Sequence, residues 1–389
     1  MNSARKHSLT VFALAVLAAT AAYADLADDF VPLRDDPTIE YAIRPTHDPI
    51  SILNAEIEAG RARLKFDGEQ GYLRSVLETL KIPIESQMAV FSKTSVQAQL
   101  INPQNPRTLF FNDSVVVGWV RGGFIEVASE SPQQGIIFYS LPQQSQEKPR
   151  FERKNDCLTC HDSYDALSVP GMLVRSNFIG PTAMTLRSLG SYNTDHRSPL
   201  EQRWGGWYVT GNSGSIRHMG NAIVTDVNEP QSAVPETLNL DSLKGKFDTS
   251  AYLSPYSDIV ALMVFEHQVH AMNLITRLTW QARYALHPVG QSALVGQNYL
   301  RNTTDALVDY MLFVDEASSL EADRGGARAV LIPVEGDHEQ SSSGERAAVV
   351  ERGLRMAVVD RGCLYAVGFA EGSFDLGGAV AEDRCPVHG

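Results

Sequence analysis

The spacing of apolar side chains changes character near residue 88. Before that point, residues 50–64 and 72–80 carry apolar side chains at the three- and four-residue spacing of amphipathic helices. After it come five short runs rich in β-branched and aromatic residues, at 88–91, 108–111, 115–120, 124–127 and 136–140. Turn residues separate these runs at intervals of about ten residues, which predicts antiparallel strands.

Two longer helical patterns follow, over residues 257–287 and 295–313. In the first pattern, seven residues fall on one mostly apolar stripe: Val260, Met263, Val264, His267, Ala271, Leu274 and Leu278. Polar residues form a neighbouring stripe: Glu266, His270, Asn273 and Arg277. Together the elements predict an α+β fold, with an antiparallel β region followed by two long packing helices.

The amino terminus has the features of a secretory signal peptide. Basic Arg5 and Lys6 precede an apolar segment at 9–22, and Ala22-Tyr23-Ala24 matches the small-x-small cleavage pattern before Asp25. No later segment approaches twenty uninterrupted apolar residues, so we expect no membrane span in the mature chain. The sequence therefore predicts a periplasmic or otherwise secreted protein, cut after Ala24.

The charge balance bears on possible partners. The chain has 46 acidic and 33 basic residues and a formal net charge of −13. An acidic protein is poorly suited to binding nucleic acid or an anionic membrane surface. A basic protein partner, such as another redox protein, is compatible with this charge.

The strongest chemical signal is the pentapeptide Cys157-Leu158-Thr159-Cys160-His161. Cys-x-x-Cys-His is the attachment signature of c-type haem. The two thiols reach the two vinyl groups on one edge of the porphyrin, and the following His binds the iron. With 4 Cys and 10 His in 389 residues, chance would produce such a pentapeptide roughly once in a thousand chains. The sequence predicts one covalent haem c, with His161 as its proximal iron ligand.

Other uses of these cysteines remain open. A thioredoxin-like redox pair normally follows a strand in a βαβ pattern, which is absent here. A structural zinc site needs a second pair of Cys or His ligands at the right spacing. Cys363 and Cys385 are too distant in sequence to indicate one, and in an oxidising compartment we expect them to form a disulfide or to stay as free thiols.

The ligand on the other side of the iron is the open question. His267 is the first candidate, because a His within an apolar stripe needs a partner; His218 and Met219 are weaker candidates, followed by Met172, Met184 and His196. Three arginines are candidates to pair with the haem propionates: Arg175, Arg203 and Arg277.

The occupancy of that position separates three functions. A second strong ligand favours an electron carrier, which is the leading prediction and assigns no catalytic residue. An open position favours a peroxidase- or oxidase-type enzyme, with His267, His270 or Glu266 as acid or base, or a haem-based sensor of a small ligand. The size of the chain favours these alternatives, because a simple carrier needs far fewer residues.

Seven blocks of this sequence together resemble a family of secreted bacterial single-haem cytochrome c proteins. They are FFNDSVVVGWV at 110–120, GIIFYS at 135–140, FERKNDCLTCH at 151–161, VPGMLVRS at 169–176, RWGGWYVTG at 203–211, HMGN at 218–221 and EHQ at 266–268. The resemblance implies covalent haem, export and electron transfer.

Four segments are expected on these grounds. Residues 1–24 form the signal peptide, 25–85 an N-terminal lead-in with helices, and 86–315 the haem-binding domain. Residues 316–389 form a C-terminal tail that contains the linker-like Ser341-Ser342-Ser343-Gly344.

Overall fold

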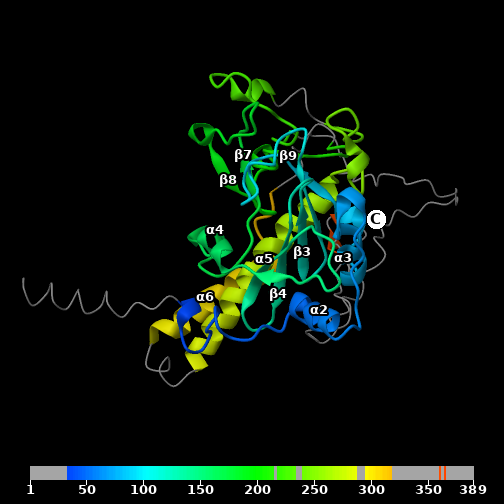
Figure 1. Ribbon diagram of the computed structural model, residues 1–389. Helices are drawn as coiled ribbons and strands as arrows, with labels where there is room; N and C mark the ends of the chain where they lie inside the picture. The colour runs from blue at the N-terminus through cyan, green and yellow to red at the C-terminus, as the bar shows by residue number, and fades with distance from the viewer. Residues whose placement is uncertain are drawn as a thin grey trace, which may run out of the picture.

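The computed structural model describes residues 33–213, 217–233, 239–286 and 294–317, together with two short strands near the C-terminus. Within these residues the chain has the predicted α+β fold, a seven-stranded antiparallel sheet with helices on both faces (Figure 1). The predicted signal peptide and the side chains of Cys363 and Cys385 lie outside the described part of the chain.

The sheet is built mainly from consecutive hairpins. Its spatial order is β6-β5-β4-β3-β2-β1-β9. The strands are β1 (Met88–Val90), β2 (Arg107–Phe111), β3 (Val115–Trp119), β4 (Ile125–Ser131), β5 (Gly135–Leu141), β6 (Glu152–Arg153) and β9 (Trp207–Tyr208). All five strands predicted between residues 88 and 140 are therefore present, each within three or four residues of its expected bounds.

Two further strand pairs lie outside the main sheet. They are β7 (Arg175–Asn177) with β8 (Ser191–Asn193), and β10 (Val359–Asp360) with β11 (Cys363–Leu364).

The helices also follow the sequence pattern. They are α2 (Pro49–Glu58), α3 (Leu73–Leu80), α4 (Leu158–His161), α5 (Ile259–Leu286) and α6 (Leu294–Met311). Short 3-10 turns lie at Leu33–Asp35, Gly68–Gln70, Ile84–Ser86, Asn155–Cys157, Tyr164–Ala166, Arg187–Leu189, Leu200–Gln202, Pro230–Ala233 and Thr249–Ala251. Asp48 caps α2 by accepting hydrogen bonds from the backbone N–H groups of Ile50 and Ser51.

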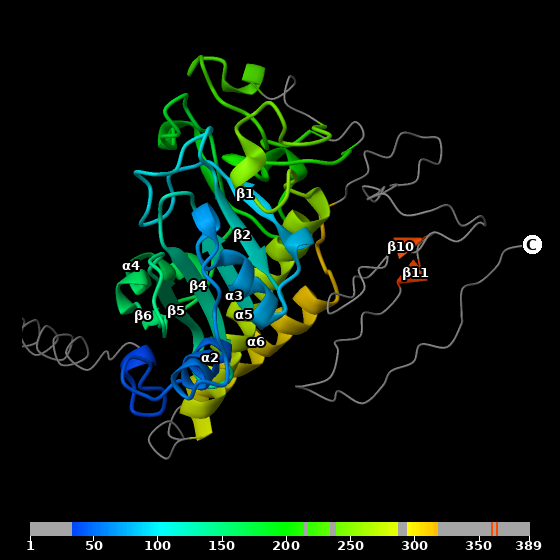
Figure 2. The same ribbon diagram turned by 45° about the vertical axis from the view of Figure 1, so that its right-hand side comes forward.

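The two faces of the sheet are covered by different helices. On one face Tyr139 of β5 donates a 2.7 Å hydrogen bond to Asp48, so this face packs against α2. On the other face the ring of Phe111 lies 5.1 Å from that of Phe265 in α5. Figure 2 shows α6 alongside α5, and the two helices pack together. α4 lies on the α5 face as well, because the neighbouring β5 residue Phe138 contacts His161 there.

The phase predicted for α5 is wrong. Val260, Met263, Val264 and His267 are only partly buried, whereas the buried residues are Ile259, Leu262, Phe265, Glu266, Val269, Met272, Asn273, Leu274, Thr276 and Trp280. The buried face therefore includes two residues of the predicted polar stripe, Glu266 and Asn273. Both have polar partners inside the protein, which removes the main penalty for burying them.

α5 is also the one described helix that is long and apolar enough to cross a membrane. Half of its most apolar stretch is buried inside the protein.

Candidate haem-attachment site

The pentapeptide lies on one short helical stretch. A 3-10 turn over Asn155–Cys157 leads directly into α4, and Leu158 anchors the stretch in the core. Cys157 and Cys160 are free thiols, the first partly buried and the second exposed. Both sulfurs are therefore available for thioether bonds, and helical geometry places them on neighbouring positions of the same surface.

Two contacts hold the end of α4 in place. Asp162 forms a 2.5 Å ion pair with Arg34, and the backbone N–H of Gly171 donates a 2.9 Å hydrogen bond to the carbonyl oxygen of His161. The Gly171 segment thus runs directly beside the pentapeptide.

The His161 imidazole is fixed by the same segment. Its Nδ1 lies 2.9 Å from the carbonyl oxygen of Gly171, and its ring lies 4.7 Å from that of Phe138. A carbonyl oxygen can only accept, so Nδ1 carries the proton in this hydrogen bond. Burial lowers the pKa of His161 and favours the neutral ring. Nε2 is then the bare nitrogen, which is the form that binds iron.

Charged side chains surround this imidazole. Arg107 of β2 and Glu126 of β4 form a 2.6 Å ion pair, and Ser95 donates a 2.5 Å hydrogen bond to Glu126. Arg107 and Arg175 lower the pKa of His161, and Glu126 raises it, so all three charges act on the ring. Glu126 also contributes, after burial and Asp156, to raising the pKa of Cys157 to about 11.

The predicted propionate partners separate in the structure. Arg175 lies near His161 and pairs with Asp165 at 2.7 Å, with both side chains well exposed. Arg203 is buried against Glu266, which leaves it unsuited to an external carboxylate. Arg277 is half-buried on α5. Arg107, which acts electrostatically on His161 and pairs with Glu126, was not predicted, because an Arg at the start of a strand carries no signal of its own.

A small open pocket lies beside the segment that follows Gly171. Its volume is about 120 Å³, and it is lined by Asp165, Met172, Leu173, Val174, Asn193, Thr194, Asp195, Val269, His270 and Asn273. Cofactor pockets are usually about 300–1,000 Å³. This pocket therefore suits water or a small molecule, and a porphyrin held by Cys157 and Cys160 would lie outside it.

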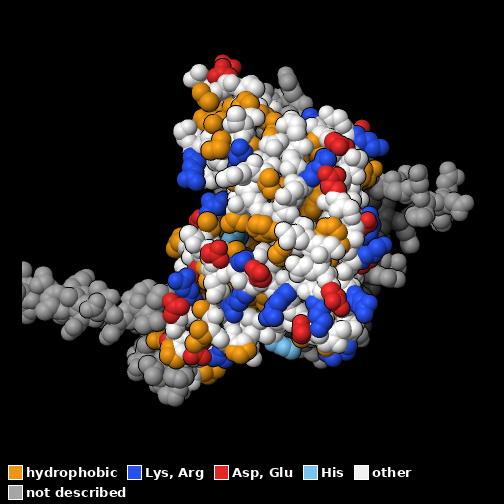
Figure 3. Space-filling model, in the orientation of Figure 1, with side chains coloured by type: hydrophobic (Ala, Val, Ile, Leu, Met, Phe, Trp, Pro, Cys, Tyr) orange, Lys and Arg blue, Asp and Glu red, His pale blue; other side chains and the backbone are white. Residues whose placement is uncertain are grey.

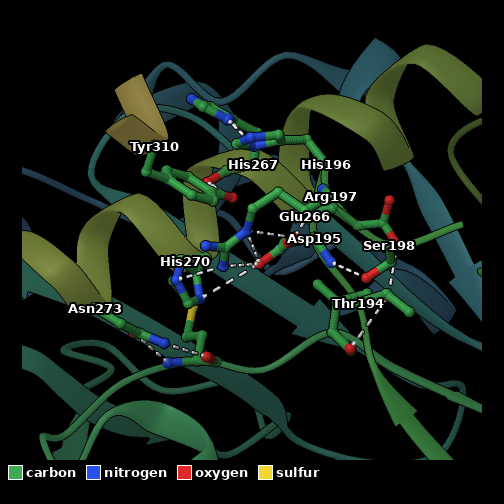
Figure 4. Close-up of polar contacts among 12 residues, drawn as sticks. Thr194, Asp195, His196, Arg197, Ser198, Glu266, His267, His270, Asn273 and Tyr310 are labelled. Atoms are coloured by element: carbon green, nitrogen blue, oxygen red, sulfur yellow. Dashed lines mark hydrogen bonds and ion pairs between the residues drawn. The ribbon is translucent and has the colours of Figure 1, made fainter. Parts of the chain in front are cut away.

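His267, the first distal candidate, lies in an aromatic cluster. Its ring stacks against Tyr310 at 4.8 Å and Phe313 at 4.6 Å, and its Nδ1 lies 2.9 Å from Nδ1 of His196 (Figure 4). The described contacts of His267 include no residue of the pentapeptide. Its assignment as an iron ligand stays a prediction. Binding of His267 to the iron would require this cluster to rearrange.

His270 and Glu266, the acid/base candidates, have separate partners. His270 lies 3.1 Å from Arg197 and 3.8 Å from Asp195, on the wall of the small pocket. Glu266 is fully buried. It accepts a 2.6 Å hydrogen bond from the Thr194 hydroxyl and forms a 3.3 Å ion pair with Arg203. Burial raises the pKa of Glu266 to about 7.

The weaker distal candidates lie in the core. His218 is 1% exposed, packs edge-on against Trp204 at 5.2 Å, and accepts a hydrogen bond from the backbone N–H of Gly220. Met219 is equally buried and accepts a 3.7 Å contact from the Ser176 hydroxyl. Neither has a described contact with the pentapeptide. Across the described residues, no group of three or more His, Cys, Asp or Glu is arranged to hold a metal ion directly.

Comparison of the chain with family models, with curated proteins and with solved structures finds no match, so the resemblance noted from the sequence blocks stays a prediction.

Proposed function

We propose that this chain is an exported c-type cytochrome. In this proposal Cys157 and Cys160 carry one haem through thioether bonds, and His161 is its axial ligand. The main support is the orientation of His161, whose Nδ1–H is directed to the Gly171 carbonyl and whose Nε2 is left as the acceptor. A hydrogen bond from the non-ligating nitrogen to a backbone carbonyl is the usual setting of a metal-binding His.

Bound haem would supply a reversible one-electron couple at its iron. The chain's own residues then have three roles. Cys157 and Cys160 fix the position of the porphyrin edge, His161 donates its Nε2 lone pair, and Arg107 and Arg175 present guanidinium groups to carboxylates at the site.

Electron transfer to another redox protein is the favoured activity. Cys160 is exposed, so a haem held there would have an edge near the protein surface, where a partner can approach. Figure 3, drawn in the orientation of Figure 1, shows acidic and basic side chains interspersed over the face turned to the viewer. The overall charge of −13 remains compatible with a basic partner.

A second candidate is a haem protein with an open iron position, either a peroxidase- or oxidase-type enzyme or a small-ligand sensor. The observation that favours it is the engagement of the distal candidates elsewhere. His267 is stacked between Tyr310 and Phe313, and Met219 packs in the core.

Two measurements test the proposal. The full chain is produced with a haem-attachment system, and the purified protein is analysed by intact mass and by the absorption spectrum of its reduced form. We expect the mass to rise by one haem and the Cys157→Ala, Cys160→Ala variant to remain colourless. A colourless wild-type protein would refute the proposal. Rapid cyanide binding to the ferric form would favour the open-iron candidate over the carrier.

A further inference from the structure

Asn273 of α5 makes two hydrogen bonds to one backbone residue beside the candidate site. Its Oδ1 accepts from the N–H of Met172 at 3.1 Å, and its Nδ2 donates to the carbonyl oxygen of Met172 at 2.8 Å. The side chain is 1% exposed. Figure 4 shows Asn273 on α5 near His270, with both amide contacts drawn. Asn273 therefore acts as a clamp on Met172, which follows the Pro170 carbonyl that accepts a hydrogen bond from Ile136 of β5.

The clamped residue is next to the one that orients His161. Gly171 immediately precedes Met172, and its carbonyl oxygen accepts from His161 Nδ1 at 2.9 Å. The peptide group between the two residues contains both this carbonyl oxygen and the Met172 N–H that Asn273 binds. A peptide group is planar and rigid, so fixing its N–H also fixes the direction of its carbonyl.

Gly171 allows Asn273 to approach this closely. A Cβ atom at position 171 would lie 2.2 Å from Oδ1 of Asn273 and 2.7 Å from its Cγ. Any side chain there would push the amide away from the peptide that it holds.

We infer that Asn273 is a positioning residue for the axial histidine, acting through the Gly171–Met172 peptide group. The inference rests on the proposed function, in which His161 binds haem iron. A fixed acceptor for Nδ1–H holds the imidazole in one tautomer and orientation, and it raises the basicity of Nε2. Loss of the clamp should weaken that hydrogen bond, make Nε2 a poorer donor and so favour the ferrous state.

The test compares Asn273→Ala and Asn273→Leu with a matched control. Leu keeps most of the side-chain volume, so an effect shared by both variants comes from the lost hydrogen bonds rather than from a cavity. Asn221 supplies the control, because its side chain also binds both the N–H and the C=O of one residue, Val209, at 2.8 and 2.9 Å. Asn221 has a φ of +68°, so Asn221→Gly removes the amide without adding backbone strain.

The first readouts use the haem-loaded full chain: the midpoint potential, and the iron–histidine stretching frequency by resonance Raman on ferrous protein whose iron is five-coordinate. We expect both Asn273 variants to lower the frequency and raise the potential, while Asn221→Gly leaves both at wild-type values. Equal spectra and potentials in wild type and in both Asn273 variants would overturn the inference. The same shift in Asn221→Gly would also overturn it, because general loosening of the fold would then explain the effect.

A second readout does not depend on haem. Nitrogen-15 NMR of the full chain without haem reports the tautomer of His161. We expect the Nδ1–H form in wild type and in Asn221→Gly, and a mixture of tautomers in the Asn273 variants. If wild type takes up no haem, the proposed function fails while this measurement still tests the clamp. If haem is bound but the tautomer and the spectra ignore Asn273, only the inference fails.

Discussion

Acid should destabilise this fold through the His196–His267 pair. The two Nδ1 atoms lie 2.9 Å apart, so one ring must donate and the other, which is then neutral, must accept. His196 is 4% exposed and its Nε2 has no hydrogen-bond partner among the described residues. Burial lowers the pKa of both residues to about 4, with the neighbouring His267 as the second cause at His196. The nearby charges oppose each other, since Asp195 raises the pKa of His196 while Arg197 and Arg203 lower it.

The size of the effect follows from the difference between folded and unfolded pKa values. An unfolded His has a pKa of about 6.5, so the unfolded chain takes up protons between about pH 6.5 and 4 that the folded chain refuses. The contribution of the neutral rings to the free energy of unfolding is therefore fully present above about pH 6.5, and it is lost as the pH drops toward 4. For His196, a pKa of about 4 corresponds to a loss of about 3 kcal/mol across this window. His267 contributes a further loss that is smaller than that of His196, because protonation of one ring opposes protonation of the other.

The assay is urea unfolding of the purified protein at a series of pH values between about 7 and 4.5, repeated with His196→Phe. A Phe at 196 suits the surrounding rings, since Tyr310 and Phe313 lie 4.2 and 4.9 Å from the His196 ring. We expect wild type to lose more free energy of unfolding between about pH 7 and 4.5 than the variant, by about 2–2.5 kcal/mol. Parallel pH profiles for the two proteins would refute the reasoning, because the loss would then arise from other groups.

Three further effects are expected. Glu266→Ala should lower the free energy of unfolding by about 3–5 kcal/mol, because it leaves its buried Arg partner uncompensated; a loss below about 1 kcal/mol in chemical denaturation would contradict this role. In the chain without haem at neutral pH, iodoacetamide should modify exposed Cys160 well before Cys157, whose pKa is raised to about 11; peptide mass mapping that finds equal rates would disprove the difference. Gly135→Ala should cost about 1–3 kcal/mol in thermal or urea unfolding, since φ is +78° and the new Cβ would lie 2.4 Å from a Thr276 methyl group; an unchanged midpoint would show that the turn adapts freely.

The sheet was predictable because its information is local. Each strand from β1 to β5 is a short run of β-branched and aromatic residues bounded by turn residues, and consecutive runs pair as hairpins. The two long helices were equally readable, because α5 and α6 carry helical patterns over many turns. The haem prediction also rests on local information, since covalent attachment requires two thiols and a His at fixed spacing, and it stays a prediction.

The orientation of α5 was not predictable in this way. Periodicity assigns apolar residues to the core and polar residues to solvent, and that rule favoured the stripe containing His267. In the structure the helix is turned so that Glu266 and Asn273 face inward, where Thr194, Arg203 and the Met172 backbone supply their partners. Those partners lie 63 to 101 residues earlier in the chain, so no sequence window around α5 contains them.

Local and distant information also separate two parts of the candidate site: the pentapeptide itself and the residues that orient His161. In the proposed function, Cys157, Cys160 and His161 are adjacent because a covalent haem needs them at fixed spacing, whereas the groups that orient His161 need only meet in space. Gly171 lies 10 residues from His161, and Asn273 lies 101 residues beyond Met172. A ring that must hold one tautomer requires a rigid acceptor, and a loop carbonyl becomes rigid only when something fixed holds it. The 28-residue helix α5, packed against the sheet, is the fixed element that Asn273 brings to this loop. The buried amide is therefore better explained as part of the site than as a defect in the core.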